Sequence, residues 1–282
     1  MDSPESSVST RSWHARLELL LSAEQGRTHL ARRAHEGPLY VQRTFRPAGD
    51  DALHLYVVHP PGGLVGGDDL EISVRLTKGA SALITTPAAQ KLYRSQGLLA
   101  RQRARLDVQD GAHLEWFPAE TIVFDGAIAR LETSVELAPG ASFCGWDVTC
   151  LGRPSAGERF AHGSLHSSFV VRRGQPLVHE RLTLEGTSVL DEPWGLAGYP
   201  VYGTLYFVPA RAAVAAQACE RLRSELAAGE GPHAVSAMDD LLVVRALGRS
   251  CEQVRAVFVR AWKLLRPLSH GAPACPPRIW ST

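Results

Sequence analysis

The sequence has no marked excess of charge of either sign. Its 30 basic and 29 acidic residues give a net charge of +1, whereas a nucleic-acid-binding protein usually carries a clear basic excess. No apolar run reaches the roughly 18 residues that a membrane-spanning helix requires. Residues 1–11 are acidic and rich in serine, and they lack the apolar core of a secretory signal. We therefore expect a cytoplasmic protein with a disordered tail over residues 1–11, which binds neither nucleic acid nor membrane.

The sequence also lacks the short motifs that most often carry catalysis. It contains no Gly-x-Ser-x-Gly elbow, no His-Glu-x-x-His motif and no Cys-x-x-Cys pair. Its five cysteines have no framework spacing, so we predict free thiols, with Cys144 and Cys150 as small core residues. The histidines are scattered, and only His162 and His166 suggest a two-histidine metal site on one side of a strand. A metal-dependent hydrolase on a β scaffold is therefore the alternative from the enzyme class, not the favoured interpretation.

Alternating apolar residues predict β-strands through the first part of the chain. Hydrophobic residues make up 45% of the sequence, which is enough for a sizeable core. The period-two pattern indicates strands over residues 13–19, 28–34, 39–45 and 53–58. We expect one domain over residues 12–282, since all-β folds reach this length as a single unit.

A loose repeat follows these strands. Gly79, Gly111, Gly140 and Gly174 recur about 30 residues apart, each between apolar residues that share one face of a strand. Each unit is therefore predicted to be a strand, a glycine turn and a second strand. Two strands bury too little surface alone, so we predict a mainly β fold in which stacked strand-turn-strand units form a large scaffold. An antiparallel meander with evenly spaced turns is the alternative.

The C-terminal third changes to a helical pattern. Apolar residues at steps of four predict an α-helix over residues 211–228, and a strand is predicted over residues 238–247. Ser250 and Gln253 then form a plausible capping box, which predicts the start of a second amphipathic α-helix. We expect this helix to end near Pro267, because proline interrupts helical hydrogen bonding.

Several carboxylates lie beside glycine, proline or aromatic residues instead of in charged surface runs. Burying such a group is costly unless it is paired or binds a cation. Ion pairs with nearby arginines are one explanation. The other is a path of ligands that holds a divalent ion weakly, so that the ion can leave again. The predicted metal ligands on this path are Asp68, Glu120, Asp147 and Glu158.

One exposed segment and the C-terminus are candidate partner-binding regions. Thr86, Lys91, Tyr93 and Arg94 lie on a predicted strand and turn, and arginine and tyrosine are enriched at binding hot spots. An edge strand protected by charge is the alternative for this segment. Trp280 is predicted either to anchor a partner or to belong to a frayed tail.

Residues 59–68 have the sequence HPPGGLVGGD. The segment lacks the Gly-Lys-Ser/Thr ending of a P-loop and the spacing of a dinucleotide fingerprint. We interpret it as a sharp hairpin corner that places Asp68 in a bent backbone.

Four motifs in this order and spacing resemble those of the UreD family of urease accessory proteins, called UreH in some organisms. They are HPPGGLVGGD at residues 59–68, TTPAAQKLYRS at 85–95, ETIVFDG at 120–126 and LGRPSAGE at 151–158. The sequence departs from the family pattern at Gln90, where threonine is expected, at Ala119, where glutamine is expected, and in SAGE, which replaces ASGE. These departures concern details of a surface.

The resemblance implies an accessory protein and not an enzyme. Proteins of this family bind apo-urease together with a UreF-type helical protein and a UreG-type GTPase, and they assist nickel incorporation into the urease metallocentre. Their fold is mainly β with a pair of helices. No cofactor is expected to be permanently bound, although Ni²⁺ is expected to bind transiently. A purely structural adaptor without a metal role is the other alternative.

Overall fold

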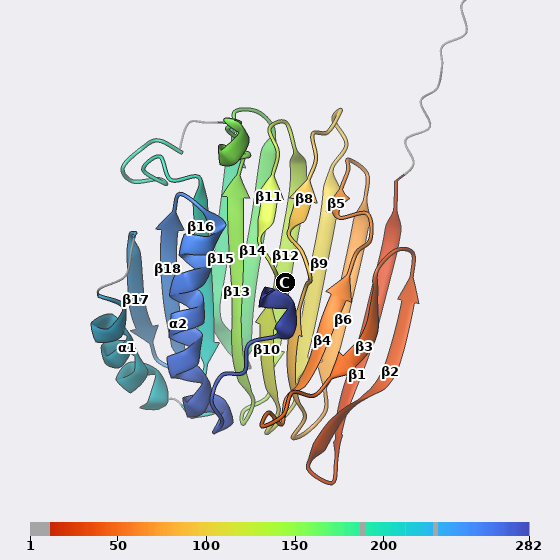
Figure 1. Ribbon diagram of the computed structural model, residues 1–282, viewed down its shortest axis with the longest axis vertical. Coiled ribbons are helices and arrows are strands. Elements are labelled where there is room, and N and C mark those ends of the chain that lie inside the picture. The colour runs from red at the N-terminus through yellow and green to blue at the C-terminus, as the bar shows by residue number, and fades with distance from the viewer. Residues whose placement is uncertain (1–11, 187–189, 212, 228–230, 282) are drawn as a thin grey trace, which may run out of the picture.

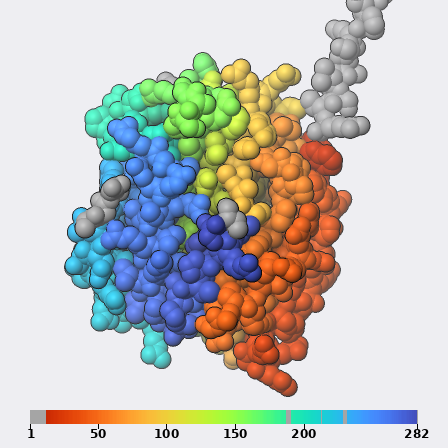
Figure 2. Space-filling view, viewed as in Figure 1, coloured from red at the N-terminus to blue at the C-terminus, as the bar shows by residue number. Residues whose placement is uncertain are grey.

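The computed structural model describes residues 12–186, 190–211, 213–227 and 231–281, so the tail predicted over residues 1–11 lies outside the described residues. Two β-sheets are stacked, and two α-helices cover the outer face of the larger sheet (Figure 1). Figure 2 shows the C-terminal segment in the middle of this face, between the second helix and the early strands. The predicted mainly β fold with two helices in the last third is confirmed.

The smaller sheet contains seven strands. In chain order they are β1 (His14–Glu24), β2 (Arg27–Glu36), β6 (Asp69–Leu76), β9 (Ala100–Val108), β12 (Ile128–Leu137), β14 (Ser164–Arg173) and β15 (Gln175–Glu185). Their order across the sheet is β15-β14-β12-β9-β6-β1-β2. The edges of this sheet are therefore β15 at one end and β2 at the other.

The larger sheet contains eleven strands. They are β3 (Tyr40–Phe45), β4 (Leu53–Val58), β5 (Gly63–Leu64), β7 (Ser81–Thr85), β8 (Gln90–Leu92), β10 (His113–Phe117), β11 (Thr121–Val123), β13 (Ser142–Leu151), β16 (Val201–Val208), β17 (His233–Met238) and β18 (Leu241–Gly248). The main order is β17-β18-β16-β13-β10-β7-β4-β3. The short strands β5, β8 and β11 form a side strip that joins the sheet through β13.

The central strands coil between the two sheets. Four-residue turns carry the chain from β6 to β7, from β9 to β10 and from β12 to β13, each time from the smaller sheet to the larger one. Strands of successive coils pair in parallel in both sheets. Gly79 and Gly111 supply the left-handed backbone of the first two turns, with φ of 70° and 66°. The prediction of stacked units is confirmed, and the antiparallel meander is wrong for these strands.

Gly174 lies between two strands as predicted, but its connection differs from the other glycine turns, and residues 59–67 differ from the expected hairpin corner. A single residue, Gly174, separates β14 from β15. Such a short connection cannot cross the ~10 Å between stacked sheets, so these strands pair antiparallel as a hairpin. Residues 59–67, in contrast, carry the chain from one sheet to the other. They were expected to form a hairpin corner, but they lead from β4 through β5 into β6 of the other sheet.

Strand β13 is buried on both faces, because one side faces the smaller sheet and the other faces the helices. Phe143 belongs to the apolar core between the sheets. Cys144, Trp146, Val148 and Cys150 belong to the core under the helices, which confirms the expectation that Cys144 and Cys150 are core residues. The alternation of side chains along a strand explains this division, and it directs Asp147 between the sheets.

The helices are α1 (Ala213–Leu226) and α2 (Cys251–His270). The Oγ of Ser250 accepts a hydrogen bond from the Gln253 amide at 3.4 Å, which confirms the predicted cap. The helix was predicted to end near Pro267; it continues through Pro267 to His270 and is capped by Gly271, whose N–H donates to the Pro267 carbonyl. Proline lacks an N–H and so removes one hydrogen bond of the helix backbone. The apolar face of α2 packs against the larger sheet, and this packing compensates for the loss. None of the described helices is long and apolar enough to cross a membrane.

The strand predicted over residues 238–247 is β18, which begins later than expected, at Leu241. Met238 ends β17, and Asp239, with φ of 47°, lies in the turn that leads to β18. Aspartate tolerates this left-handed conformation better than most residues. The segment is therefore a hairpin at the edge of the larger sheet.

A buried ion cluster fastens α2 to the larger sheet. The Arg266 guanidinium donates to Asp50 Oδ1 at 2.6 Å and to Glu115 Oε1 at 3.0 Å, and all three side chains are fully buried. Trp262 Nε1 donates to the same Glu115 oxygen at 2.5 Å, and His54 Nε2 lies 3.0 Å from Asp50 Oδ2. Burial opposes ionisation of Asp50, but the hydrogen bonds from His54 and Arg266 lower its pKa below the usual range.

Candidate functional site

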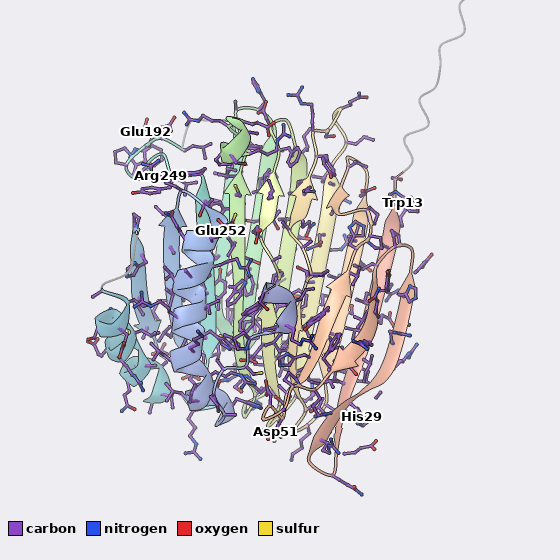
Figure 3. The ribbon with its side chains drawn as sticks, viewed as in Figure 1. Trp13, His29, Asp51, Glu192, Arg249 and Glu252 are labelled. Carbon is purple, nitrogen blue, oxygen red and sulfur yellow. The ribbon has the colours of Figure 1, made fainter. Side chains whose placement is uncertain are left out.

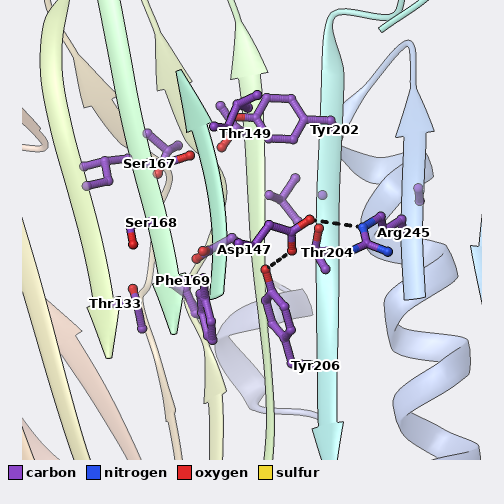
Figure 4. Close-up of a pocket in the computed structure, with 18 of the residues that line it drawn as sticks. Thr133, Asp147, Thr149, Ser167, Ser168, Phe169, Tyr202, Thr204, Tyr206 and Arg245 are labelled. Atoms are coloured by element: carbon purple, nitrogen blue, oxygen red, sulfur yellow. Dashed lines mark hydrogen bonds and ion pairs between the residues drawn. The ribbon is translucent and has the colours of Figure 1, made fainter. Parts of the chain in front are cut away.

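A cavity of about 520 Å³ lies between the two sheets, toward the end where β15 and β18 approach each other. Side chains from both sheets line it, as Figure 4 shows. The polar residues on which the argument below depends are Asp147, Thr149, Glu180, Tyr202, Tyr206 and Arg245.

Asp147 lies on β13 and is directed into this cavity. Its carboxylate makes no hydrogen bond or ion pair with any described residue, and its nearest charged neighbour is the like-charged Glu180. Burial, with a further contribution from the negative charge of Glu180, raises the pKa of Asp147 to about 7. Near neutral pH the protonated and the ionised forms of this carboxyl group are therefore both populated.

Glu180 of β15 faces Asp147 from the smaller sheet. The Tyr206 hydroxyl donates to Glu180 Oε2 at 2.5 Å, and Arg245 Nε donates to Glu180 Oε1 at 3.0 Å. Arg245 and Glu180 are partly exposed, so this ion pair connects the two sheets where the cavity reaches the surface. Burial and the nearby charge of Glu180 raise the pKa of Tyr206 well above its usual value, which keeps the hydroxyl protonated as a donor.

Hydroxyl groups supply most of the remaining polar surface. Thr149, Ser167 and Ser168 line the same space, together with Tyr202, whose pKa burial raises to about 12. Oxygen donors of this kind, together with water, suit a hydrated divalent cation that is held weakly. No group of three or more His, Cys, Asp or Glu side chains in the described part of the chain is arranged to hold a metal ion tightly.

Asp68 and Glu158, two of the other predicted ligands, have structural partners. Asp68 is buried in the turn before β6, where it accepts hydrogen bonds from the amides of Trp13 at 2.8 Å and Val65 at 2.9 Å. Glu158 pairs with Arg153, and this hydrogen bond is the main cause of its lowered pKa. Glu158 is therefore explained by an ion pair with an arginine, as the alternative proposed. Asp68 is explained by its hydrogen bonds to backbone amides.

Glu120, the fourth predicted ligand, lies on the helix side of the larger sheet. Its Oε2 is 3.7 Å from Arg255 of α2 and makes no hydrogen bond with the described residues. Residues on either side of it, Ala119 and Thr121, line the cavity instead. Of the four predicted ligands, only Asp147 faces the cavity, and metal binding by the others stays a prediction.

The two histidines proposed as a metal pair contact different residues. His162 Nδ1 lies 3.2 Å from Asp125 Oδ2, and His166 Nδ1 lies 3.3 Å from Thr183 Oγ1. Asp125 also accepts the amides of Ala161 and His162, so its carboxylate organises a loop. These contacts give His162 and His166 separate surroundings.

Three of the predicted partner-binding residues lie along the side strip of β5, β8 and β11 or beside it. Lys91 lies in β8, and the Tyr93 ring packs edge-on against Phe124 with ring centres 5.1 Å apart. Arg94 is largely exposed and pairs with Asp125 at 3.3 Å. Their binding to a partner stays a prediction.

Thr86 and Trp280 make contacts within the chain. Thr86 Oγ1 accepts the Ala119 amide at 2.9 Å. Trp280 lies in a short 3₁₀ helix (Arg278–Ser281), donates to Thr85 Oγ1 at 3.1 Å and packs 5.6 Å from the Trp262 ring. The frayed-tail alternative for Trp280 is therefore wrong, while its role as a partner anchor stays a prediction.

The family model described as UreD urease accessory protein matches this chain over residues 14–281. The chain belongs to the UreD family. The "Urease accessory protein UreD" of Azoarcus sp. (strain BH72) is 47% identical over 274 residues, which cover 96% of this chain and 94% of that protein. The protein of the same name from Dechloromonas aromatica (strain RCB) is 44% identical over 277 residues, which cover 96% and 95%. The resemblance carried by the four motifs is confirmed, and it extends through both helices.

Sequence reasoning missed the other half of the cavity of this UreD-family chain. Glu180 lies between His179 and Arg181 in a polar stretch that resembles an ordinary solvated strand. The Glu180 side chain points into the cavity because of the register in which β15 pairs with β14. The short turn between the two strands determines this register. Tyr206 and Arg245 had no local signal, because their contact with Glu180 joins strands that are far apart in the sequence.

Proposed function

We propose that this protein is a non-catalytic metallochaperone that helps incorporate nickel into apo-urease. Membership of the UreD family supports a role in urease maturation, because the relatives are named as urease accessory proteins. The single observation that carries the metal role is Asp147, a carboxylate that faces the cavity between the sheets without a partner among the described residues. In this proposal the ion is cargo, and no cofactor is permanently bound.

A carboxyl group with a pKa near 7 suits the transfer of a cation. The proton can leave when Ni²⁺ arrives, since a nearby positive charge favours the ionised form, and it can return when the ion departs. Glu180 and the hydroxyls would share the ion without replacing its whole water shell. Weak binding of this kind permits release, as it does in ion-conducting pores.

The scaffold around the cavity would bind the other proteins of the assembly. We propose that one face docks apo-urease and another a UreF-type helical protein, through which a UreG-type GTPase joins the complex in the cytoplasm. The side strip with Lys91, Tyr93 and Arg94 is the proposed contact face, because exposed arginine and tyrosine form hot spots.

The test is co-expression with the urease subunits and the two helper proteins, followed by capture of the complex and measurement of nickel in the captured urease. Omission of this chain should abolish nickel loading. If urease is captured and loaded equally well without this chain, the proposed function is wrong. Turnover of a small molecule by the isolated protein would instead support the hydrolase alternative.

Matched variants separate a conduit from a purely structural adaptor. Asp147→Asn removes the ionisable group in the cavity, whereas Asp107→Asn changes an outer-surface carboxylate that pairs with Arg75 at 2.9 Å. The conduit predicts lower nickel loading with Asp147→Asn alone, at unchanged capture of urease. Equal loading with both variants would favour the adaptor. Asp68→Ala and Glu158→Ala are expected to act through folding, because both carboxylates have structural partners.

A further inference from the structure

Cys150 of β13 and Cys251 of α2 lie on the helix side of the larger sheet, away from the cavity. Both belong to the apolar core beneath the helices, Cys150 as a buried member and Cys251 as a partly exposed one. They are far apart in the sequence, and neither was assigned a role beyond packing. Their relative position follows from the way α2 crosses the sheet.

Helix α2 runs along β13, and one turn of the helix covers about the same length as two residues of the strand. The Phe258 ring lies 6.1 Å from the Trp146 ring. One turn earlier, Val254 lies against Gly203, where a Cβ would be 3.0 Å from Val254 Cγ1, and Gly203 pairs with Val148 in the sheet. One further turn toward the start of the helix brings Cys251 over the next inward position of β13, which is Cys150.

Contacts of neighbouring residues also place Cys251 of α2 over Cys150 of β13. Arg255 lies one turn after Cys251 on the same helix face and is 3.7 Å from Glu120 Oε2. Glu120 directly precedes β11, whose Ile122 pairs with Cys150. The two thiols interact: a hydrogen bond from Cys251 lowers the pKa of Cys150 and raises that of Cys251.

We propose that Cys150 and Cys251 are a redox modification site that forms a reversible intramolecular disulfide with a peroxide as oxidant. Hydrogen peroxide oxidises one thiol to a sulfenic acid, and one oxygen leaves as water. The second sulfur then attacks the sulfenic sulfur, the S–S bond forms and a second water leaves. Two thiols and one peroxide therefore give one disulfide and two waters, and a dithiol reductant reverses the step.

Access and position favour this pair over the other cysteines. Cys251 is partly exposed at the first turn of α2, near Arg249 and Glu252, which Figure 3 labels, so peroxide can reach the pair from solvent. Cys144 is buried on the same face of β13 but lies near Glu115 and Arg266 instead. The disulfide would tie the start of α2 to the strand whose opposite face carries Asp147.

The test treats the reduced full-length protein with hydrogen peroxide, then alkylates the free thiols and maps the products by mass spectrometry. We expect two of the five thiols to disappear, a monomer lighter by two hydrogens, and a cross-link between the peptides that contain Cys150 and Cys251. Dithiothreitol should restore all five thiols. The oxidised protein should melt several degrees higher than the reduced one, because the cross-link constrains the unfolded chain.

Three variants make the result specific. Cys150→Ser and Cys251→Ser should each abolish the cross-link and the peroxide-dependent rise in melting temperature, whereas Cys144→Ser, on the same strand, should keep both. Mapping of the wild-type protein suffices if a variant fails to fold. Five unchanged thiols, a cross-link that uses another cysteine, a disulfide between two molecules, or a sulfinic acid on Cys251 without a cross-link would each overturn the proposal.

Discussion

Asp50 and Glu115 share one buried guanidinium, whereas Asp147 faces an inter-sheet cavity and has no partner within the part of the chain that the structure describes. Around Arg266 every carboxylate has a charged or hydrogen-bonding neighbour, and the pKa values of Asp50 and Glu115 are lowered although burial opposes this. In the cavity, burial and a second carboxylate raise the pKa of Asp147 to about 7. The same side-chain chemistry is thus stabilised in one place and left unsatisfied in the other.

The difference separates a structural role from a functional one. A fully paired buried cluster holds α2 in one position, and its hydrogen-bonding capacity is used within the chain. An unpaired carboxylate costs stability, so its persistence in a cavity points to a ligand that arrives from outside. The following predictions test this contrast, from the largest expected effect to the smallest.

Arg266→Met is expected to have the largest effect on stability. The substitution leaves Asp50 and Glu115 buried without their counter-charge, and breaking such a pair costs about 3–5 kcal/mol of unfolding free energy. Urea denaturation of the full chain measures this loss. Arg172→Met, at an exposed pair with Glu136, is the matched control and should change stability by less than about 1 kcal/mol. Equal effects of the two variants would show that the cluster does not fasten α2.

Asp147→Asn should instead stabilise the protein at neutral pH, by about 1–4 kcal/mol. The folded-state pKa of Asp147 is about 7, above the ordinary value of 3.8. Between these values the unfolded chain releases the proton and the folded protein keeps it, so stability falls as the pH rises from about 4 to 7. Asparagine does not ionise and removes this loss. Denaturation midpoints at pH 4.5 and 7.5 should show a much larger gain at the higher pH, and a destabilising effect at pH 7.5 would contradict the assignment.

His270→Gln should flatten the pH dependence of stability on the acid side. Burial lowers the pKa of His270 to about 4, although Asp50 and Glu115 lie near it. The unfolded chain therefore takes up this proton first, and stability is lost as the pH falls from about 6.5 to 4, by about 1–3 kcal/mol. The variant should lose less stability than the wild type over this interval. An unchanged slope would show that His270 does not stay neutral in the fold.

Arg94→Ala is expected to change stability least, by less than about 1 kcal/mol, because the Arg94 side chain of this pair is largely exposed. If the side strip binds apo-urease or a helper protein, the same change should lower capture of the complex several-fold. Arg172→Ala, on the other sheet, should leave capture unchanged. Full capture by the Arg94→Ala protein would remove this residue from the proposed contact face.

The coil of the fold was predictable because its signals are local. Gly79 and Gly111 mark turns between apolar strands, and four-residue turns of this kind cross from one sheet to the other. Gly174 also lies between two strands, as predicted, but the glycine interval does not show whether a strand crosses or folds back, because the length of the connection decides this. The end of α2 was predicted to within three residues, and tertiary packing maintains the helix through Pro267 to His270.

The site was predictable only in part, because its residues meet through long-range pairing. Asp147 is conspicuous as an acidic residue in a strand that is otherwise nearly all apolar. Glu180 has polar neighbours on both sides, and no local pattern shows that it points inward. Arg266 and Asp50 are separated by most of the chain, so their pairing could not be read from spacing.

The most direct test of the account is the nickel content of urease captured with the Asp147→Asn protein at limiting nickel, compared with the Asp107→Asn protein in complexes of equal stoichiometry. Because the first variant removes the only ionisable group of Asp147 without loss of stability at neutral pH, the account predicts several-fold less nickel per urease for Asp147→Asn and wild-type loading for Asp107→Asn. Equal nickel content in the two complexes would contradict the claim that the cavity carboxylate carries the ion.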